Sequence, residues 1–348
     1  MAYTTIDKPT DFFNTVLYTG TAGTQAITGV GFAPNWVWGK ARNATEGQSF
    51  HDTVRGTGKN MLANSDAAEE AIASVTAFGS DGFTLGSNAH MNNNNSPTVA
   101  WCWKAETAFS NDASSTSIGS IDSAGSVNND AGFSIVSYTG TGSNGTIKHG
   151  LSSAPKMIIQ KNRDESQPWW TYHDSIGAGG QLRLNENDAA GSDGGVLWNS
   201  TAPTSSVFSV GDNTGTNGSA DKCIAYCFAD VKGYSKFGSY TGNGNVDGTF
   251  IYTGFKPAFV MTKRTNGGGD WAIMDNKRNP FNVMNIYLKA QAADAEATGQ
   301  SFDIDGFSNG FKLRYNNSNY NGNGGAYIYM AFAETPFVSS GNVPGTAR

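Results

Sequence analysis

Two histidine–aspartate neighbours, His51-Asp52 and His173-Asp174, are the residues closest to an acid–base pair. A histidine held by a carboxylate can move protons near neutral pH. Adjacent residues of a strand point to opposite faces, however, so each histidine and its own aspartate cannot easily cooperate. A third copy of this segment, described below, carries Met274 at the histidine position. We therefore interpret the histidines as structural and predict no catalytic residue and no enzyme.

A lysine and an aspartate recur with nearly constant spacing, and two explanations are open. They could form a catalytic pair, or they could be a salt bridge or a turn-fixing carboxylate at the same place in three hairpins. A catalytic pair repeated three times would be unusual, so the sequence favours the structural explanation. The pairs are Lys40 with Asp52, Lys161 with Asp174, and Lys263 with Asp275, separated by 12, 13 and 12 residues.

Three tryptophans, Trp169, Trp170 and Trp271, are the candidate ligand-binding residues. An indole flanked by Asn, Asp and Gln can stack on the C–H face of a sugar while the polar groups take its hydroxyls. We align Trp170 with Trp271, and Trp169 with the non-aromatic Gly47 and Asp270, so the shared core would not require Trp169. The alternative is that these rings pack on the sheet.

No metal or cofactor is predicted. Asp303 opens a segment like a calcium loop, but Arg314 stands where the twelfth-position Glu should be. The oxygen-rich stretch 212–221 is a second calcium candidate, although Asn/Asp/Gly strings usually form turns. The cysteines, Cys102, Cys223 and Cys227, lack zinc spacing and are expected to be small, buried, reduced side chains.

These residues belong to three copies of one segment of about 95 residues. Each copy begins with Tyr-Thr-Gly, continues through a proline six residues before the lysine, and closes on an aromatic strand. Short strands and tight turns predict an all-β chain of three antiparallel β-sandwich-like units with little helix, the best helical candidate of unit one being 66–73. The units could be separate domains that follow one another like beads along the chain, or they could pack around a pseudo-threefold axis as one body. The predicted division is a leader 1–11, unit one 12–105, a Ser/Gly/Asp-rich linker 106–131, unit two 132–230, unit three 233–335 and a tail 336–348.

Composition excludes several classes of partner. The 348 residues contain 44 glycines and only 15% charged residues, with a formal net charge of −6. Scattered Lys and Arg argue against nucleic acid, which requires a clustered basic face. The sequence has no run of 18 apolar residues, so no membrane insertion is expected. The first residues lack the pattern of a signal peptide, so secretion by that route is not expected.

Several long motifs resemble a family of virion structural proteins of tailed phages, many from aquatic bacteria. The motifs are the opening Met1–Pro9, the block from Ala154 to Arg163, the stretch Trp198–Phe208 and Phe237–Gly244. The resemblance covers nearly the whole chain. It implies a tail-fibre-like or otherwise surface-exposed virion component, and it brings no catalytic residues with it.

The sequence thus leads to a non-enzymatic phage virion protein, exposed on the tail as a fibre-type subunit or on the head as a decoration. It would be assembled in the host cytoplasm and released by lysis, with other virion proteins and host-surface glycans as partners. By family analogy we expect a homo-oligomer, with a trimer favoured. The alternatives are a stand-alone carbohydrate-binding module or lectin and, third, a polysaccharide depolymerase.

Overall fold

Alternation of large and small side chains builds the strands at the centre of this protein. In the segment Val99–Trp103, the side chains of Val99, Trp101 and Trp103 enter one core, and those of Ala100 and Cys102 enter another. Successive residues of a strand face opposite sides, so such a strand is buried on both faces. The computed structural model, which describes residues 3–299 and 301–346, confirms the all-β prediction.

Each unit has one larger antiparallel sheet, and the three sheets share one strand order. In unit one the order is β1 (Phe13–Thr19), β8 (Pro97–Trp103), β3 (Trp36–Ala41), β4 (Ser49–Asp52) and β5 (Met61–Leu62). In unit two it is β11 (Phe133–Thr139), β18 (Lys222–Phe228), β13 (Met157–Asn162), β14 (Trp170–His173), β15 (Gly180–Arg183) and β16 (Gly191–Ser192). In unit three it is β19 (Ser235–Thr241), β27 (Ala326–Pro336), β21 (Phe255–Arg264), β22 (Ala272–Asp275), β23 (Ile286–Lys289) and β24 (Ala297–Thr298).

A smaller sheet covers the outer face of each large sheet. The two sheets enclose a hydrophobic core that belongs to that unit alone, which we call its private core. The small sheets are β2 (Gln25–Ile27), β7 (Gly82–Leu85) and β6 (Val75–Gly79) in unit one, β12 (Gly145–Lys148) and β17 (Val207–Val210) in unit two, and β20 (Phe250–Tyr252), β26 (Gly310–Leu313) and β25 (Ile304–Phe307) in unit three. The described helices are single turns: η1 (Pro9–Asp11), α1 (Ala89–Asn92), α2 (Ala113–Thr116) and α3 (Thr214–Asn217). Each unit is therefore a small sandwich.

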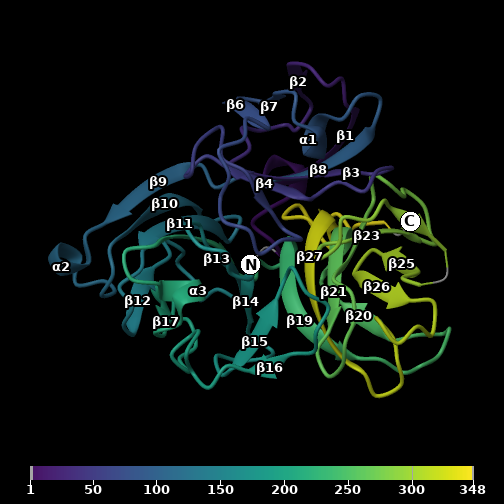
Figure 1. Cartoon of the computed structure of the whole chain (residues 1–348). Helices are drawn as coiled ribbons and strands as arrows, with labels where there is room; N and C mark the ends of the chain where they lie inside the picture. The colour runs from purple at the N-terminus through teal and green to yellow at the C-terminus, as the bar shows by residue number, and fades with distance from the viewer. Residues whose placement is uncertain (1–2, 300, 347–348) are drawn as a thin grey trace.

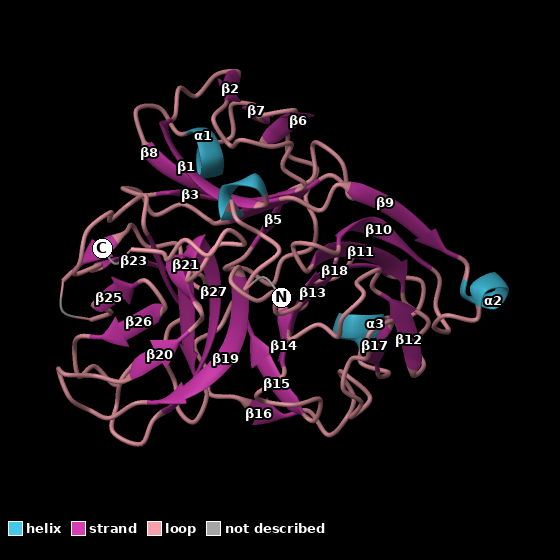
Figure 2. Ribbon diagram, turned by 180° about the vertical axis from the view of Figure 1, so that it is seen from behind, coloured by secondary structure: helices cyan, strands magenta, loops and turns pink. Residues whose placement is uncertain are grey.

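The inner faces of the three large sheets meet in one shared core, and the three lobes are visible in Figures 1 and 2. Aromatic rings join every pair of units. Trp36 stacks on Tyr226 of unit two at 4.4 Å between centroids, and Phe13 stacks on Phe332 of unit three at 4.9 Å. Units two and three meet through Phe228 and Phe332, 6.2 Å apart. Of the two arrangements open from the sequence, the chain adopts the pseudo-threefold body rather than beads.

The linker expected at 106–131 is instead part of unit two. Strands β9 (Thr107–Asn111) and β10 (Ser123–Asn128) form a hairpin around α2, and β10 pairs with β11. Backbone pairing and the partly buried Phe109, which packs on the core of unit two, order a segment that is poor in large apolar residues. This two-stranded extension has no counterpart in the other large sheets.

One further expectation is corrected. Residues 66–73 are not helical, because their backbone forms hydrogen bonds with unit two. Asp66 O accepts from Lys161 Nζ at 3.1 Å, and Glu69 N donates to Arg163 O at 2.8 Å. Residues 3–11 of the expected leader are tied to the rest of the chain. Ile6 lies in the shared core, and Asp7 accepts a hydrogen bond from the backbone N–H of Ser340, which ties the two ends of the chain together.

Candidate functional site

The three recurring lysines lie between the units and donate to backbone carbonyls. Lys161 Nζ donates to Asp66 O of unit one at 3.1 Å, and Lys263 Nζ donates to Asp188 O of unit two at 2.6 Å. Lys40 Nζ closes the cycle on Ala293 O of unit three at 2.8 Å. Burial lowers the pKa of each lysine to about 8. Among the described residues no ion pair joins these lysines to the aspartates predicted as partners, so of the two structural explanations the salt bridge is wrong.

Backbone hydrogen bonds two residues further on repeat the cycle. Glu69 N donates to Arg163 O at 2.8 Å, Ala190 N donates to Thr265 O at 2.8 Å, and Glu296 N donates to Arg42 O at 2.7 Å. Two of the three interfaces between units, called joints from here on, add a charge-assisted hydrogen bond. These bonds are Arg163–Glu69 at 2.8 Å and Arg42–Glu296 at 2.7 Å. The third joint has Thr265 and Ala190 and cannot form one. The unit interfaces are thus related to one another by the same local geometry.

The tryptophans belong to the same joints, and their predicted alignment is wrong. Trp169 and Trp271, each eight residues after the recurring lysine, occupy equivalent places, and Gln48 takes that place in unit one. Trp169 Nε1 donates to Leu62 O of unit one at 2.8 Å, and Trp271 Nε1 donates to Arg183 O of unit two at 2.9 Å. Gln48 Nε2 donates to Ala292 O of unit three at 3.1 Å.

Burial removes Trp169 and Trp271 as sugar platforms. Their side chains are 0% and 1% exposed, because the neighbouring unit covers them. Trp170 faces the other way, is half-buried and packs against the private core of unit two, where the backbone of Gly215 approaches its indole nitrogen closely enough to exclude any larger residue. The glycan-binding hypothesis for Trp169 and Trp271 is therefore wrong, and their recurrence is explained by packing.

The recurring aspartates fix turns and reach the next unit. Asp52 Oδ1 accepts from Arg55 N at 2.8 Å, its other oxygen pairs with the Arg55 guanidinium at 2.5 Å, and Tyr226 of unit two donates to it at 2.8 Å. Asp275 repeats this arrangement with Arg278 at 2.5 Å and with Trp101 Nε1 of unit one at 3.1 Å. The turn-fixing role predicted for these two carboxylates is confirmed.

Asp174 is not the third member of this set. His173 pairs with Met157 across the sheet as Asp52 pairs with Trp36, and it stands twelve residues after Lys161. Its Nδ1 accepts from Ser175 N at 3.2 Å, so Nε2 carries the proton and donates to Tyr329 O of unit three at 3.4 Å. Asp174 is exposed and pairs with Lys156 at 2.8 Å. A count of 12 rather than 13 from the lysine would have found the equivalent residue.

Lowering the pH from 7 to 5 is expected to destabilise the protein through His173, which contacts unit three. Burial lowers the pKa of His173 to about 4, against an ordinary value of 6.5. Between these values the unfolded chain binds a proton that the native state excludes, so stability falls as the pH falls. The free energy of unfolding, measured in urea at pH 7 and at pH 5, falls between the two pH values. The His173→Asn variant should show a fall that is smaller by about 1–2 kcal/mol. His51 and His149, with pKa values lowered by burial to about 3 and about 4, supply the remaining dependence. An undiminished loss in the variant would contradict this assignment.

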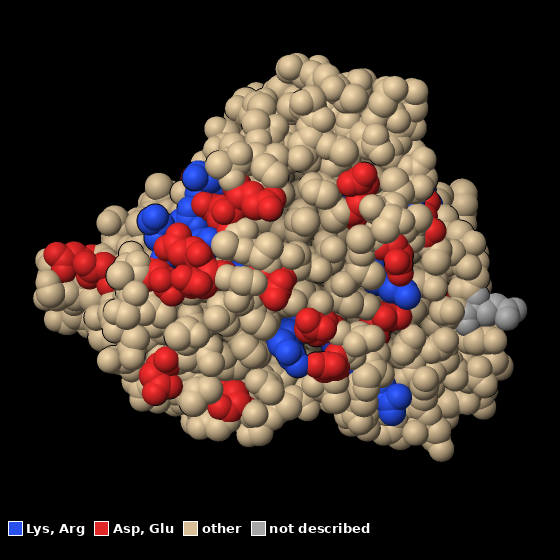
Figure 3. Space-filling view, in the orientation of Figure 1, with Lys and Arg blue, Asp and Glu red and all other residues tan. Residues whose placement is uncertain are grey.

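The remaining candidate residues gather no metal site. Within residues 3–299 and 301–346, no group of three or more His, Cys, Asp or Glu side chains could hold an ion. Cys102, Cys223 and Cys227 are free thiols at 0% exposure, as expected. Burial raises the pKa of Cys223 to about 12, which keeps it protonated. The face seen in Figure 3 carries some acidic groups alone and others beside basic groups, and its basic residues form no stripe.

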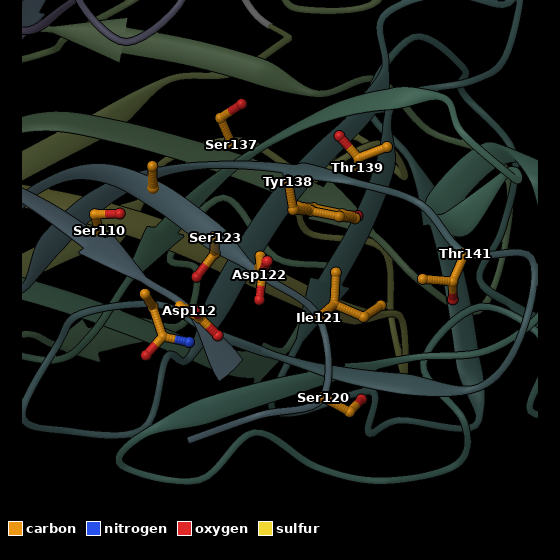
Figure 4. Close-up of a pocket in the computed structure, with 12 residues that line it drawn as sticks. Ser110, Asp112, Ser120, Ile121, Asp122, Ser123, Ser137, Tyr138, Thr139 and Thr141 are labelled. Carbon is orange, nitrogen blue, oxygen red and sulfur yellow. The ribbon is translucent and has the colours of Figure 1, made fainter. Parts of the chain in front are cut away.

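A groove of about 600 Å³ lies on unit two, formed by β9, β10, β11 and the turn around α2 (Figure 4). Hydroxyls and carboxylates dominate its wall; they include Ser110, Asp112, Ser120, Asp122, Ser123, Ser137, Thr139 and Thr141. Several of these groups already have structural roles. Asp112 Oδ1 caps α2 by accepting from Ser115 N at 3.1 Å, and Asp122 Oδ1 accepts from Ala113 N at 2.8 Å.

The groove suits a hydroxyl-bearing ligand but offers no ring for stacking. Its aromatic residue, Tyr138, is 4% exposed and donates its hydroxyl to Thr216 O at 2.6 Å. Sequence reasoning missed this site because residues 106–131 were expected to be a linker. The Ser-rich pattern of two short alternating segments around Asp112–Asp122 is the signal that could have identified a polar hairpin.

A family model described as a domain of unknown function (DUF7483) matches residues 8–336. The match includes all three units and the hairpin that carries the groove. No curated protein matches the chain. No helix of the described residues has the length and apolar character needed to cross a membrane.

Proposed function

We propose that this chain, which belongs to the family described as a domain of unknown function (DUF7483), is a non-enzymatic structural protein of a phage virion. It stands on the tail as a fibre-type subunit or on the head as a decoration, beside other virion proteins. The sequence resemblance to tailed-phage virion proteins supports this proposal.

One observation carries the structural part of the proposal. The residues that could have done chemistry, Lys40, Lys161 and Lys263 with Asp52 and Asp275, are buried and hold neighbouring units together. Groups fixed in this way do not reach a substrate. A body closed on a common core resists local opening, since no unit can leave without exposing that core. Such resistance suits a particle exposed outside its host.

A second candidate function, a carbohydrate-binding module or lectin, is favoured by the hydroxyl-lined groove on unit two. The two functions are compatible when the particle surface contacts host glycans. A depolymerase is less favoured, because the recurrent histidine, lysine and aspartate positions serve packing.

Antibody labelling of the parent particle tests the proposal. Negative-stain images should show label at fixed places on the tail or head, and mass spectrometry of purified particles should detect the chain. A chain recovered only from the particle-free lysate would contradict the proposal.

Self-association is measured separately, by the mass of the protein in solution. A trimer predicts three times the chain mass, whereas a monomer would mean that the three internal units take the place of three chains.

A further inference from the structure

The outer strand β20 of unit three presents aromatic rings to solvent. Phe250 and Tyr252 are 44% and 54% exposed, while Ile251 between them is 5% exposed and lies in the private core. Alternate residues of a strand share a face, so the two rings lie on the same outer side. Phe307 of the adjoining hairpin meets Phe250 edge-on at 5.9 Å and enlarges the aromatic surface.

The fold does not require these rings. Ile251 pairs with Phe311 as Ile27 pairs with Phe83 and Ile147 pairs with Phe208, which fixes the correspondence among β20, β2 and β12. The neighbours that correspond to Phe250 are Ala26 and Thr146, and those that correspond to Tyr252 are Thr28 and Lys148. Two of three copies therefore fold with small or polar residues at both positions. Exposed aromatic surface that packing does not explain indicates binding.

A cavity of about 400 Å³ opens beside Tyr252 and adds polar groups of defined position. Tyr3 donates its hydroxyl to Gly254 O at 2.9 Å, so the Tyr252 hydroxyl, 3.2 Å away, donates to the Tyr3 oxygen. These bonds hold the edge of the Tyr252 ring against the leader. More than half of the Tyr252 surface stays exposed to solvent.

Two lysines and Asp230 line the cavity, and they leave one positive charge without a counter-charge. Lys236 Nζ is held by Asp230 at 2.9 Å, whereas Lys232 Nζ stands over the Tyr3 ring at 4.4 Å. No carboxylate in the described part of the chain lies within ion-pair distance of Lys232. An ammonium without a carboxylate partner beside an exposed ring can bind a ligand carboxylate.

We propose that this cavity binds an acidic saccharide, with a sugar ring stacked on Tyr252 and its carboxylate at Lys232. The ring supplies the apolar face that a pyranose needs, and the ammonium supplies charge complementarity. The inference rests on the proposed function in one respect: it names the glycan class that the particle surface would meet.

Titration calorimetry with tetragalacturonate and with maltotetraose, at low salt, tests the inference on the full chain. The acidic tetrasaccharide should bind at least tenfold more tightly than the neutral one, and 0.5 M NaCl should weaken it. Tyr252→Ala should reduce affinity tenfold or more, whereas Tyr252→Phe, which keeps the ring, should retain most of it. Lys232→Gln should remove the preference for the acidic sugar.

Lys148→Ala is the matched control, since Lys148 corresponds to Tyr252 in unit two and its replacement should leave affinity unchanged. Thermal unfolding of each variant checks that the fold is retained. Absence of binding at millimolar concentration, or equal binding by Tyr252→Ala and the unaltered chain, would overturn the inference. Particle labelling is independent of this result: a labelled particle without sugar binding removes the inference alone, and an unlabelled particle removes the proposed function alone.

Discussion

Trp169→Ala should destabilise the protein by about 3–5 kcal/mol, the range for removing a fully buried tryptophan. The Trp169 ring meets Phe50 of unit one at 4.9 Å and lies parallel to Tyr226 at 6.3 Å, so its loss opens a cavity in the shared core. It also leaves Leu62 O without the Nε1–H donor. Equilibrium unfolding in urea, followed by fluorescence and circular dichroism, measures the effect.

The next residue in the chain provides the control. Trp170 is half-buried and packs on the private core of unit two, so Trp170→Ala should cost only about 1–2 kcal/mol. Trp169→Phe separates packing from hydrogen bonding, because it retains a ring but removes the Nε1–H donor, so that Leu62 O keeps its bond from Ser65 N; the expected cost is about 1 kcal/mol. Equal losses for the two alanine variants would contradict the burial assigned to Trp169.

Asp52→Ala should cost about 3 kcal/mol or more, because it leaves the Arg55 guanidinium buried without its principal partner. Both side chains of this pair are 0% exposed, and Tyr226 of unit two loses its acceptor as well. Glu69, 3.1 Å from Arg55, retains part of the charge compensation, so the cost should not reach that of an isolated buried ion.

Asp174→Ala is the contrasting variant, since the spacing of the sequence had aligned Asp174 with Asp52. Its pair with Lys156 is exposed, and exposed pairs contribute about 0–1 kcal/mol. Comparison of the two urea midpoints under identical conditions is sufficient. A loss for Asp174→Ala as large as that for Asp52→Ala would show that the pairing described for β13 and β14 is wrong.

The sequence predicted the class of fold and the recurrence of the core strands because those depend on local patterns. Alternation at Val99–Trp103 and its two counterparts specifies strands buried on both faces. The partners of Lys161 and Trp169 could not be predicted in the same way. Both bind carbonyls of unit one, and a backbone carbonyl has no signature in the sequence.

The candidate site shows the same limit. Exposure distinguishes Tyr252 from Trp169, and nothing in the residue types does so. Trp169 looked dispensable only because a one-residue shift placed it opposite Gly47 and Asp270, whereas Gln48 and Trp271 are its true equivalents. The hairpin at 107–128 was missed because few large apolar residues mark it, and pairing with β11 supplies its order.

The central claim is that the three units form one body on a shared core, and calorimetry of the full chain tests it most directly. Every pair of units contributes rings to that core, so no unit can unfold without exposing the others. We predict a single thermal transition whose calorimetric and van't Hoff enthalpies agree. Two or three separate transitions, or a calorimetric enthalpy about three times the van't Hoff value, would contradict the claim and show that the units unfold independently.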